Sequence, residues 1–198
     1  MRNLFAISAA LVLIAGAGAQ QTKQTKGKES GAAWTILFNG TSLDNWNTIG
    51  TANWKLAGGV VEASSGNGLL VSKATYKDFE LRAEFWVDGP ANSGVFVRCT
   101  NAQEITPDNA YEVNVYDTRP DQTYATGSIV NVAPPSTPMK TAGKWNTFEI
   151  TAQGTHLVVT LNGTKTVDVR NDKFPAGAIG LQYAAGVVKF RSVQIRPL

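Results

Sequence analysis

Residues 77–99 read KDFELRAEFWVDGPANSGVFVRC, and residues 110–117 read AYEVNVYD. Successive side chains of a β-strand point to opposite faces, so each segment can be sorted into two faces. Residues 79–87 place Phe79, Leu81, Ala83, Phe85 and Val87 on one face, and Glu80, Arg82, Glu84 and Trp86 on the other. This alternation predicts a strand that packs one face against a core.

The next two predicted strands alternate in the same way. The second has Val95, Val97 and Cys99 on its apolar face, with Phe96 and Arg98 opposite; the third has Val113 and Val115, with Glu112, Asn114 and Tyr116 opposite. If the three strands are neighbours, one sheet face gathers two carboxylates, an arginine, an amide and aromatic rings. A solvated face needs no such mixture of acids and rings, but a sugar-binding site does.

The composition points to one globular all-β domain. The chain has 198 residues, of which 43% are hydrophobic and 17% charged, with 19 glycines. That length allows a substantial core, and β-branched and aromatic residues between Gly, Asn and Pro favour strands. The formal net charge is +3, with the basic excess largely in residues 20–30, so nucleic acid is not an expected partner.

The N-terminal residues 1–19, MRNLFAISAALVLIAGAGA, have the pattern of a secretory signal peptide with cleavage after Ala19. The alternative is a retained membrane anchor, but the apolar run is shorter than the roughly 20 residues that span a bilayer. We expect an exported protein, periplasmic or extracellular, without stable membrane insertion after signal removal. Residues 20–33 are predicted to be a flexible polar linker, and residues 34–198 the folded domain.

Cys99 is the only cysteine, so an intramolecular disulfide is not possible. Its place on an apolar strand face predicts a buried, inert thiol. The only histidine, His156, lies in a predicted hairpin turn, which disfavours cysteine–histidine catalysis. We expect no metal or other cofactor, because the sequence has no carboxylate and histidine cluster with a metal-binding spacing.

Turn signals divide the domain into about a dozen short strands, the spacing of a two-sheet β-sandwich. Gly58-Gly59 and Asn162-Gly163 predict two hairpin turns. In the last strand the apolar residues change parity after Phe190, which predicts a β-bulge near residues 191 and 192.

A series of segments along the chain resembles one known family. These are FNGTSLDNW, DFELRAEF, NSGVFVR, YEVNVYD, GKWNTFEI, LNGTKT, GAIGLQY and VKFRSVQI, in that order. The chain resembles the 3-keto-disaccharide hydrolases over residues 34–198, which implies a concanavalin-A-like lectin/glucanase sandwich, or jelly roll. It departs from the family at Asn114, where a glutamine is usual, and at Ala184, where a histidine is frequent. An aromatic residue that the family often has after the TG of residues 126–127 is missing. Where the family usually has the ending FRN, this chain has Phe190-Arg191-Ser192.

Two carboxylates, Glu84 and Glu112, are the predicted acid–base pair. Arg98 either stabilises a substrate oxyanion or neutralises Glu112, and the two carboxylates could instead be surface acids that pair with Arg82 and Arg98. The predicted substrate-binding residues are Asn114, Tyr116, Asp117, Gln182 and Trp86. Asp117, which closes the family's YE motif, could equally cap a turn.

The resemblance implies an enzyme that cleaves the glycosidic bond of 3-keto-glycosides or 3-keto-disaccharides. Elimination followed by hydration, or direct hydrolysis, would both suit a pair of carboxylates. The alternative is a non-catalytic, lectin-like carbohydrate-binding module, because one fold serves both functions. In either case the expected partner is a carbohydrate.

Overall fold

The computed structural model describes Met1 and residues 32–198. Apart from Met1 and residues 32 and 33, the predicted signal peptide and linker lie outside the described residues. None of the described residues forms a helix long and apolar enough to cross a membrane.

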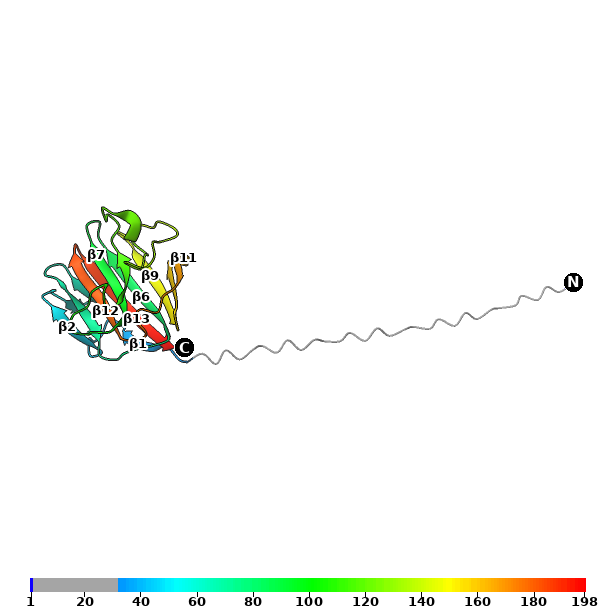
Figure 1. Ribbon diagram of the computed structural model, residues 1–198, viewed down its shortest axis with the longest axis horizontal. Coiled ribbons are helices and arrows are strands. Elements are labelled where there is room, and N and C mark those ends of the chain that lie inside the picture. Colours follow the sequence, from blue (N-terminus) through cyan, green and yellow to red (C-terminus); the bar gives the residue numbers. More distant parts are fainter. Residues whose placement is uncertain (2–31) are drawn as a thin grey trace. The chain divides into compact units, whose positions relative to one another are not determined.

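The described part of the domain consists of two antiparallel sheets (Figure 1). The eight-stranded sheet has the order β11-β10-β9-β6-β13-β4-β3, and β1 also pairs with β13. Its strands are β1 (Thr35–Phe38), β3 (Lys55–Ala57), β4 (Val60–Ala63), β6 (Phe79–Val87), β9 (Trp145–Gln153), β10 (His156–Leu161), β11 (Thr164–Arg170) and β13 (Val188–Pro197).

The five-stranded sheet has the order β2-β5-β12-β7-β8. Its strands are β2 (Trp46–Gly50), β5 (Gly68–Ser72), β7 (Asn92–Cys99), β8 (Tyr111–Val115) and β12 (Ala178–Ala185). A single turn of 3₁₀-helix, η1 (Gln122–Tyr124), follows β8 at the end of the sandwich that is uppermost in Figure 1. The predicted all-β, two-sheet sandwich is confirmed.

The main core lies between the two sheets. The eight-stranded sheet contributes the apolar face predicted for residues 79–87, and the five-stranded sheet contributes Val95, Val97, Val113, Val115, Ile179 and Leu181. A second, smaller apolar cluster contains Phe96, Leu69, Val71 and Ile105 and lies on the other face of the five-stranded sheet. The two outer faces of the sandwich therefore point in opposite directions, which decides which predicted site residues can meet.

Local sequence signals set several connections correctly. Gly58-Gly59 joins β3 to β4, and Asn162-Gly163 joins β10 to β11. All four residues have positive φ angles, as a two-residue hairpin turn of type I′ requires. The register between β13 and β6 shifts between Phe190 and Ser192, so the predicted bulge is also confirmed.

The connection between β6 and β7 is not a hairpin. Residues 88–91 carry the chain from the eight-stranded sheet to the five-stranded sheet. Asp88 holds this corner, because its backbone N–H donates to the Val187 carbonyl at 3.1 Å and its carboxylate accepts from the Val187 N–H at 3.0 Å. The chain therefore changes sheet between Glu84 and Glu112.

Candidate functional site

The structure separates the residues that the sequence predicted to share one pocket. Glu84 and Trp86 project from β6 on the outer face of the eight-stranded sheet, whereas Glu112 and Asn114 are on β8 in the five-stranded sheet. The core lies between them. The prediction of a shared pocket with two carboxylates is wrong, because it assumed that strands adjacent in sequence are adjacent in one sheet.

On the outer face of the eight-stranded sheet, each predicted site residue already has a charged partner. Glu84 pairs with Arg191, whose guanidinium lies 4.4 Å from the centroid of the Trp145 ring. The ammonium of Lys189 lies 5.1 Å from the Trp86 ring centroid. Long cationic side chains thus cover the rings and neutralise the acids.

A pocket of about 290 Å³ on the same face has the same character. Its lining includes Trp34, Arg82 and Glu149, with an Arg82–Glu149 ion pair of 2.9 Å. A second ion pair, Arg196–Glu80, is 2.6 Å long, and both guanidinium groups lie about 5 Å from the Trp34 ring centroid. With its acids paired and its ring in contact with two cations, this pocket is a network of surface ion pairs.

Arg98 does not join Glu112 either, because a bulge in β7 breaks the predicted alternation. Arg98 has a φ of +54°, and the register between β7 and β12 shifts between the Cys99–Ala178 and Phe96–Gly180 pairs. As a result Cys99 packs with Phe96 in the smaller apolar cluster rather than in the main core. The thiol is nevertheless buried as predicted, and burial raises its pKa to about 12.

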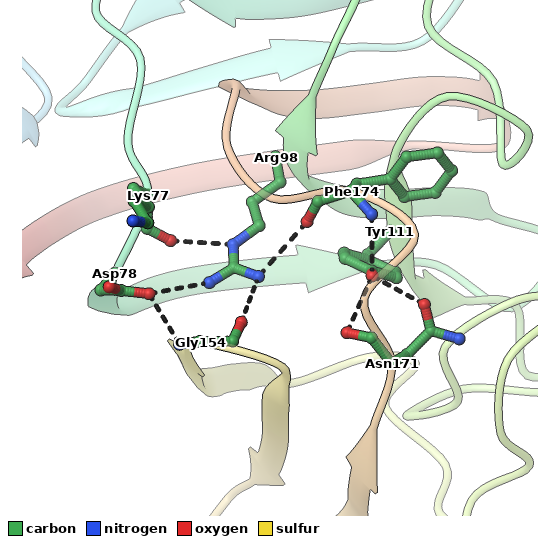
Figure 2. Close-up of polar contacts among 7 residues, drawn as sticks. All are labelled: Lys77, Asp78, Arg98, Tyr111, Gly154, Asn171 and Phe174. Carbon is green, nitrogen blue, oxygen red and sulfur yellow. Dashed lines mark hydrogen bonds and ion pairs between the residues drawn. The ribbon is translucent and has the colours of Figure 1, made fainter.

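The guanidinium of Arg98 is a structural centre (Figure 2). It donates to the carbonyls of Lys77 at 2.8 Å, Gly154 at 2.8 Å and Phe174 at 3.3 Å, and it pairs with Asp78 at 3.1 Å. Only 1% of Arg98 is exposed. The prediction that it faces a substrate is therefore wrong; it joins the start of β6, the β9–β10 turn and the segment before β12.

The outer face of the five-stranded sheet carries a row of polar residues across neighbouring strands. Gln182 on β12 pairs with Gly94 on β7, which pairs with Asn114 on β8. Beyond β8, the Asn114 N–H donates to the Ser128 carbonyl at 3.1 Å. Paired residues of antiparallel strands point to the same face, so Gln182, Asn114 and Ser128 share this face. We call these three residues the polar row.

The polar row is short of hydrogen-bond partners. Four buried side-chain atoms have no partner among the described residues, and three of them are Gln182 Oε1, Asn114 Oδ1 and Ser128 Oγ. The Asn114 orientation is set by its Nδ2, which donates to the Tyr124 carbonyl at 2.5 Å. Buried polar groups are nearly always paired, so three unpaired oxygens in one row make this face the candidate site.

Glu112 lies next to the polar row. It is two residues before Asn114 on β8 and pairs with Phe96 on β7. The residue is 8% exposed, and burial raises the pKa of its carboxyl to about 7, against a smaller opposite effect of the Arg119 charge. No hydrogen bond to this carboxylate is found among the described residues. Glu112 is thus a partly desolvated acid that can change protonation near neutral pH.

Asp117 and Tyr116 follow at the end of β8 with different roles. Asp117 is buried and accepts hydrogen bonds from Thr126 Oγ1 at 2.6 Å, from the Thr141 N–H at 2.6 Å and from the Ala142 N–H at 2.9 Å. Its carboxylate has a structural role, but it caps no local turn: it joins the end of β8 to residues 126, 141 and 142. Tyr116 is half-buried and has the strand parity of Asn114.

Sequence reasoning missed Ser128, Gly94 and Arg119. Ser128 has a weak signal, because the sequence of residues 126–132, TGSIVNV, predicts a short strand and Ser128 precedes the core residue Ile129. In the structure this segment makes only isolated bridges, such as Val113–Ile129. No group of three His, Cys, Asp or Glu residues arranged to hold a metal ion occurs in the described part of the chain.

The fold is a two-sheet antiparallel β-sandwich, and three buried oxygens on the outer side of its five-stranded sheet have no partner among the described residues. Residues 33–196 match the 3-keto-alpha-glucoside-1,2-lyase-like domain, so the chain belongs to that family. No curated protein matches it.

Several solved structures are similar to this chain. A candidate glycosyl hydrolase from Parabacteroides distasonis is 26% identical, with a TM-score of 0.72 over 84% of this chain and 100% of that one. A second from the same organism is 17% identical, with a TM-score of 0.73 over 83% and 94%. The carbohydrate-binding module CBM66 from Bacillus subtilis is 17% identical, with a TM-score of 0.59 over 84% and 97%. The family and these neighbours indicate a glycosyl-hydrolase-like or carbohydrate-binding module.

Two departures from the family pattern fall on this face. Asn114 belongs to the polar row, and Ala184 follows Gln182 by two residues on β12, at a point where the register between β12 and β7 shifts. Ala184 is half-buried. The frequent histidine of the family would therefore stand two residues along β12 from Gln182, and here that imidazole is replaced by a methyl group.

Proposed function

We propose that this protein cleaves the glycosidic bond of 3-keto-glycosides by elimination, with Glu112 as the general base. The observation that carries the proposal is the carboxyl of Glu112, whose pKa burial raises to about 7 beside three unpartnered oxygens. A base works best when its pKa lies near the operating pH. The unpartnered oxygens suit a ligand rich in hydroxyl donors.

The proposed reaction needs one base at the carbon next to the ketone. Glu112 removes the C2 proton, and the electron pair of the C–H bond moves toward the C3 ketone to give an enolate. Return of these electrons forms the C1–C2 double bond and breaks the bond from C1 to the leaving oxygen, which takes up a proton. Water then adds across the double bond, so the net result is hydrolysis.

The separation of Glu84 from Glu112 favours this route over classical glycoside hydrolysis. Both retaining and inverting hydrolysis use two carboxylates that flank the scissile bond at a set distance. Of the two predicted carboxylates only Glu112 is beside the polar row. With Arg98 occupied elsewhere, Arg119 is the cation whose charge acts on Glu112, and we assign to it the stabilisation of the enolate.

A lectin-like module is the second candidate, and the polar row itself favours it. Amide and hydroxyl oxygens are the groups with which a binding site reads sugar hydroxyls. A binding site, however, has no use for a desolvated carboxylate poised near neutral pH. We propose in addition that either activity takes place after export, because residues 1–19 have the pattern of a signal peptide.

The decisive experiment incubates the protein with a 3-keto-disaccharide and with the unoxidised disaccharide. Release of the two halves from the keto substrate alone supports the proposal. Carrying out the reaction in D₂O separates the two routes: elimination and hydration place deuterium at C2, whereas direct hydrolysis leaves the original hydrogen there.

Glu112→Gln keeps the shape of the side chain and removes the base. We expect turnover to fall by roughly 10²–10⁴-fold, the usual contribution of a general base. Glu84→Gln is the matched control and should leave turnover unchanged. If the wild-type protein binds the keto-disaccharide but never cleaves it, the lectin-like function replaces this proposal.

A further inference from the structure

Gly94 occupies the middle of the polar row. It pairs with Gln182 on one side and Asn114 on the other, so it is a position without a side chain between two amides. Its φ angle lies outside the left-handed region, so the backbone conformation does not require a glycine here. The reason for a glycine must therefore be the space above it.

The side chain of Glu112 fills that space. A Cβ atom built on Gly94 would lie 3.2 Å from Glu112 Cγ, 3.2 Å from Glu112 Oε1 and 3.3 Å from the Val113 carbonyl oxygen, all closer than ordinary van der Waals contact. The carboxylate thus lies across β7 rather than extending away from β8. In this pose the sheet removes much of its contact with water, and the carboxylate is placed between Gln182 and Asn114.

We propose that Gly94 is a positioning residue that seats Glu112 over β7, and that the reacting carbon of the sugar lies above Gly94 with its hydroxyls directed to Gln182 and Asn114. The second part rests on the proposed function, while the first part concerns the carboxylate alone. The ligand class that fits is a neutral sugar ring placed across β12, β7 and β8. Its hydroxyls would donate to the unpartnered Gln182 Oε1 and Asn114 Oδ1.

The surroundings of Glu112 make desolvation the main control on its protonation. Phe96 pairs with it on β7, and Val130 lies opposite it on the other side, where the Val130 N–H donates to the Glu112 carbonyl at 3.0 Å. Neither side chain carries a charge. Arg119, in the loop after β8, is the charged group that acts on the carboxyl and favours its ionised form.

The Gly94→Ala variant tests whether Gly94 positions the Glu112 side chain over β7. The added methyl group should push the carboxylate outward into water, and a ¹³C NMR titration of the Glu112 carboxyl would measure the change, with its signal assigned from Glu112→Gln. We expect the midpoint to fall from about 7 by roughly one pH unit as desolvation weakens. The acidic limb of the kcat/KM profile should move with it, and kcat should fall roughly tenfold to a hundredfold through misplacement of the base.

Gly89→Ala is the matched control, because a Cβ at Gly89 meets no atom within 4 Å. It should leave the titration and the rate unchanged. If Gly94→Ala folds and the titration midpoint of the Glu112 carboxyl is unaltered, the proposal that Gly94 positions Glu112 is wrong. If the Glu112 midpoint shifts in Gly94→Ala but the wild-type protein never cleaves a keto sugar, the positioning role of Gly94 is supported and the proposed function is wrong.

A double variant covers the case in which Gly94→Ala does not fold. Combining it with Glu112→Ala deletes the two nearest of the three atoms that the new methyl group would crowd and leaves the Val113 carbonyl oxygen. The double variant should therefore fold, and Gly94→Ala should cost less stability in that background than in the wild type. If the double variant also fails to fold, the crowding comes from the backbone, and the proposal that Gly94 positions Glu112 is wrong.

Discussion

The two polar regions of the five-stranded sheet, one around Arg98 and one around Glu112, differ in how completely their groups are paired. Arg98 is 1% exposed and its guanidinium contacts three carbonyls and a carboxylate (Figure 2). Glu112 is 8% exposed, and the polar row beside it has three oxygens without partners. Burial is similar in both regions. The number of hydrogen-bond partners therefore distinguishes Arg98, which stabilises the fold, from the groups beside Glu112, which are the candidates for binding a ligand.

The physical reason is the cost of leaving a buried polar group unpaired. A buried donor or acceptor without a partner costs about 1–3 kcal/mol, whereas a satisfied one contributes modestly to stability. Evolution tolerates such a cost chiefly where function needs it. The sequence predicted both Arg98 and Glu112 as catalytic. Their hydrogen-bond partners in the structure distinguish them, because within the described part of the chain the guanidinium of Arg98 is paired and the carboxylate of Glu112 is not.

Removing the Arg98 cation should give the largest loss of stability. Arg98→Met keeps much of the side-chain volume but leaves the carbonyls of Lys77, Gly154 and Phe174 and the carboxylate of Asp78 without their donor. Breaking a buried ion pair costs about 3–5 kcal/mol, and we expect a loss of that order in the free energy of unfolding, measured with denaturant. A loss below about 1 kcal/mol would mean that Arg98 is not a structural centre.

Removing the Glu112 charge should have the opposite sign above neutral pH. The pKa of Glu112 is raised from 4.5 to about 7, so the folded state favours the protonated form more than the unfolded state does. Stability from this group is present below about pH 4.5 and is lost as the pH rises through 7. Because one pKa unit corresponds to about 1.4 kcal/mol, the rise of about 2.5 pKa units, from 4.5 to about 7, limits the loss to about 3.5 kcal/mol.

Glu112→Gln should therefore be more stable than the wild type at pH 8 and should lack this decline between pH 4.5 and 7. Thermal or denaturant unfolding at several pH values measures it. A variant that is less stable than the wild type at pH 8 would show that the carboxylate has partners in solution and belongs with Arg98 in the paired class.

The sequence predicted the faces of regular strands well, because alternation in β6 and β8 is uninterrupted. It failed at Arg98, since a bulge with positive φ reverses the alternation and no residue type marks it. It failed also at residues 88–91, where a Gly-Pro turn suits a hairpin and a corner between sheets equally. What fixes the corner is Val187, about a hundred residues further along the chain, and a local pattern cannot carry such a contact.

A smaller effect is expected at Ser128, and a second buried serine provides the control. Ser128 Oγ has no partner, whereas Ser72 Oγ donates to the Ala74 carbonyl at 2.7 Å and accepts from the Ile179 N–H at 2.9 Å. Ser72→Ala should destabilise by about 1 kcal/mol through lost hydrogen bonds. Ser128→Ala should leave the melting temperature unchanged or raised, while weakening sugar binding in calorimetry. Equal destabilisation by both variants would place Ser128 among the structural residues.

The smallest effect is expected at Glu84, on the far side of the core from Glu112. Its side chain and that of its partner Arg191 are 34% and 46% exposed, and exposed ion pairs contribute about 0–1 kcal/mol because water screens them. Glu84→Gln should therefore change the free energy of unfolding by within about 0.5 kcal/mol and leave cleavage of a 3-keto-disaccharide at the wild-type rate. The useful comparison is with Glu112→Gln under the same conditions, since the two changes are chemically identical and differ only in which face of the sandwich they alter. If Glu84→Gln reduced turnover as strongly as Glu112→Gln while both proteins stayed folded, the reaction would need carboxylates from both faces, and a site confined to the five-stranded sheet could not account for it.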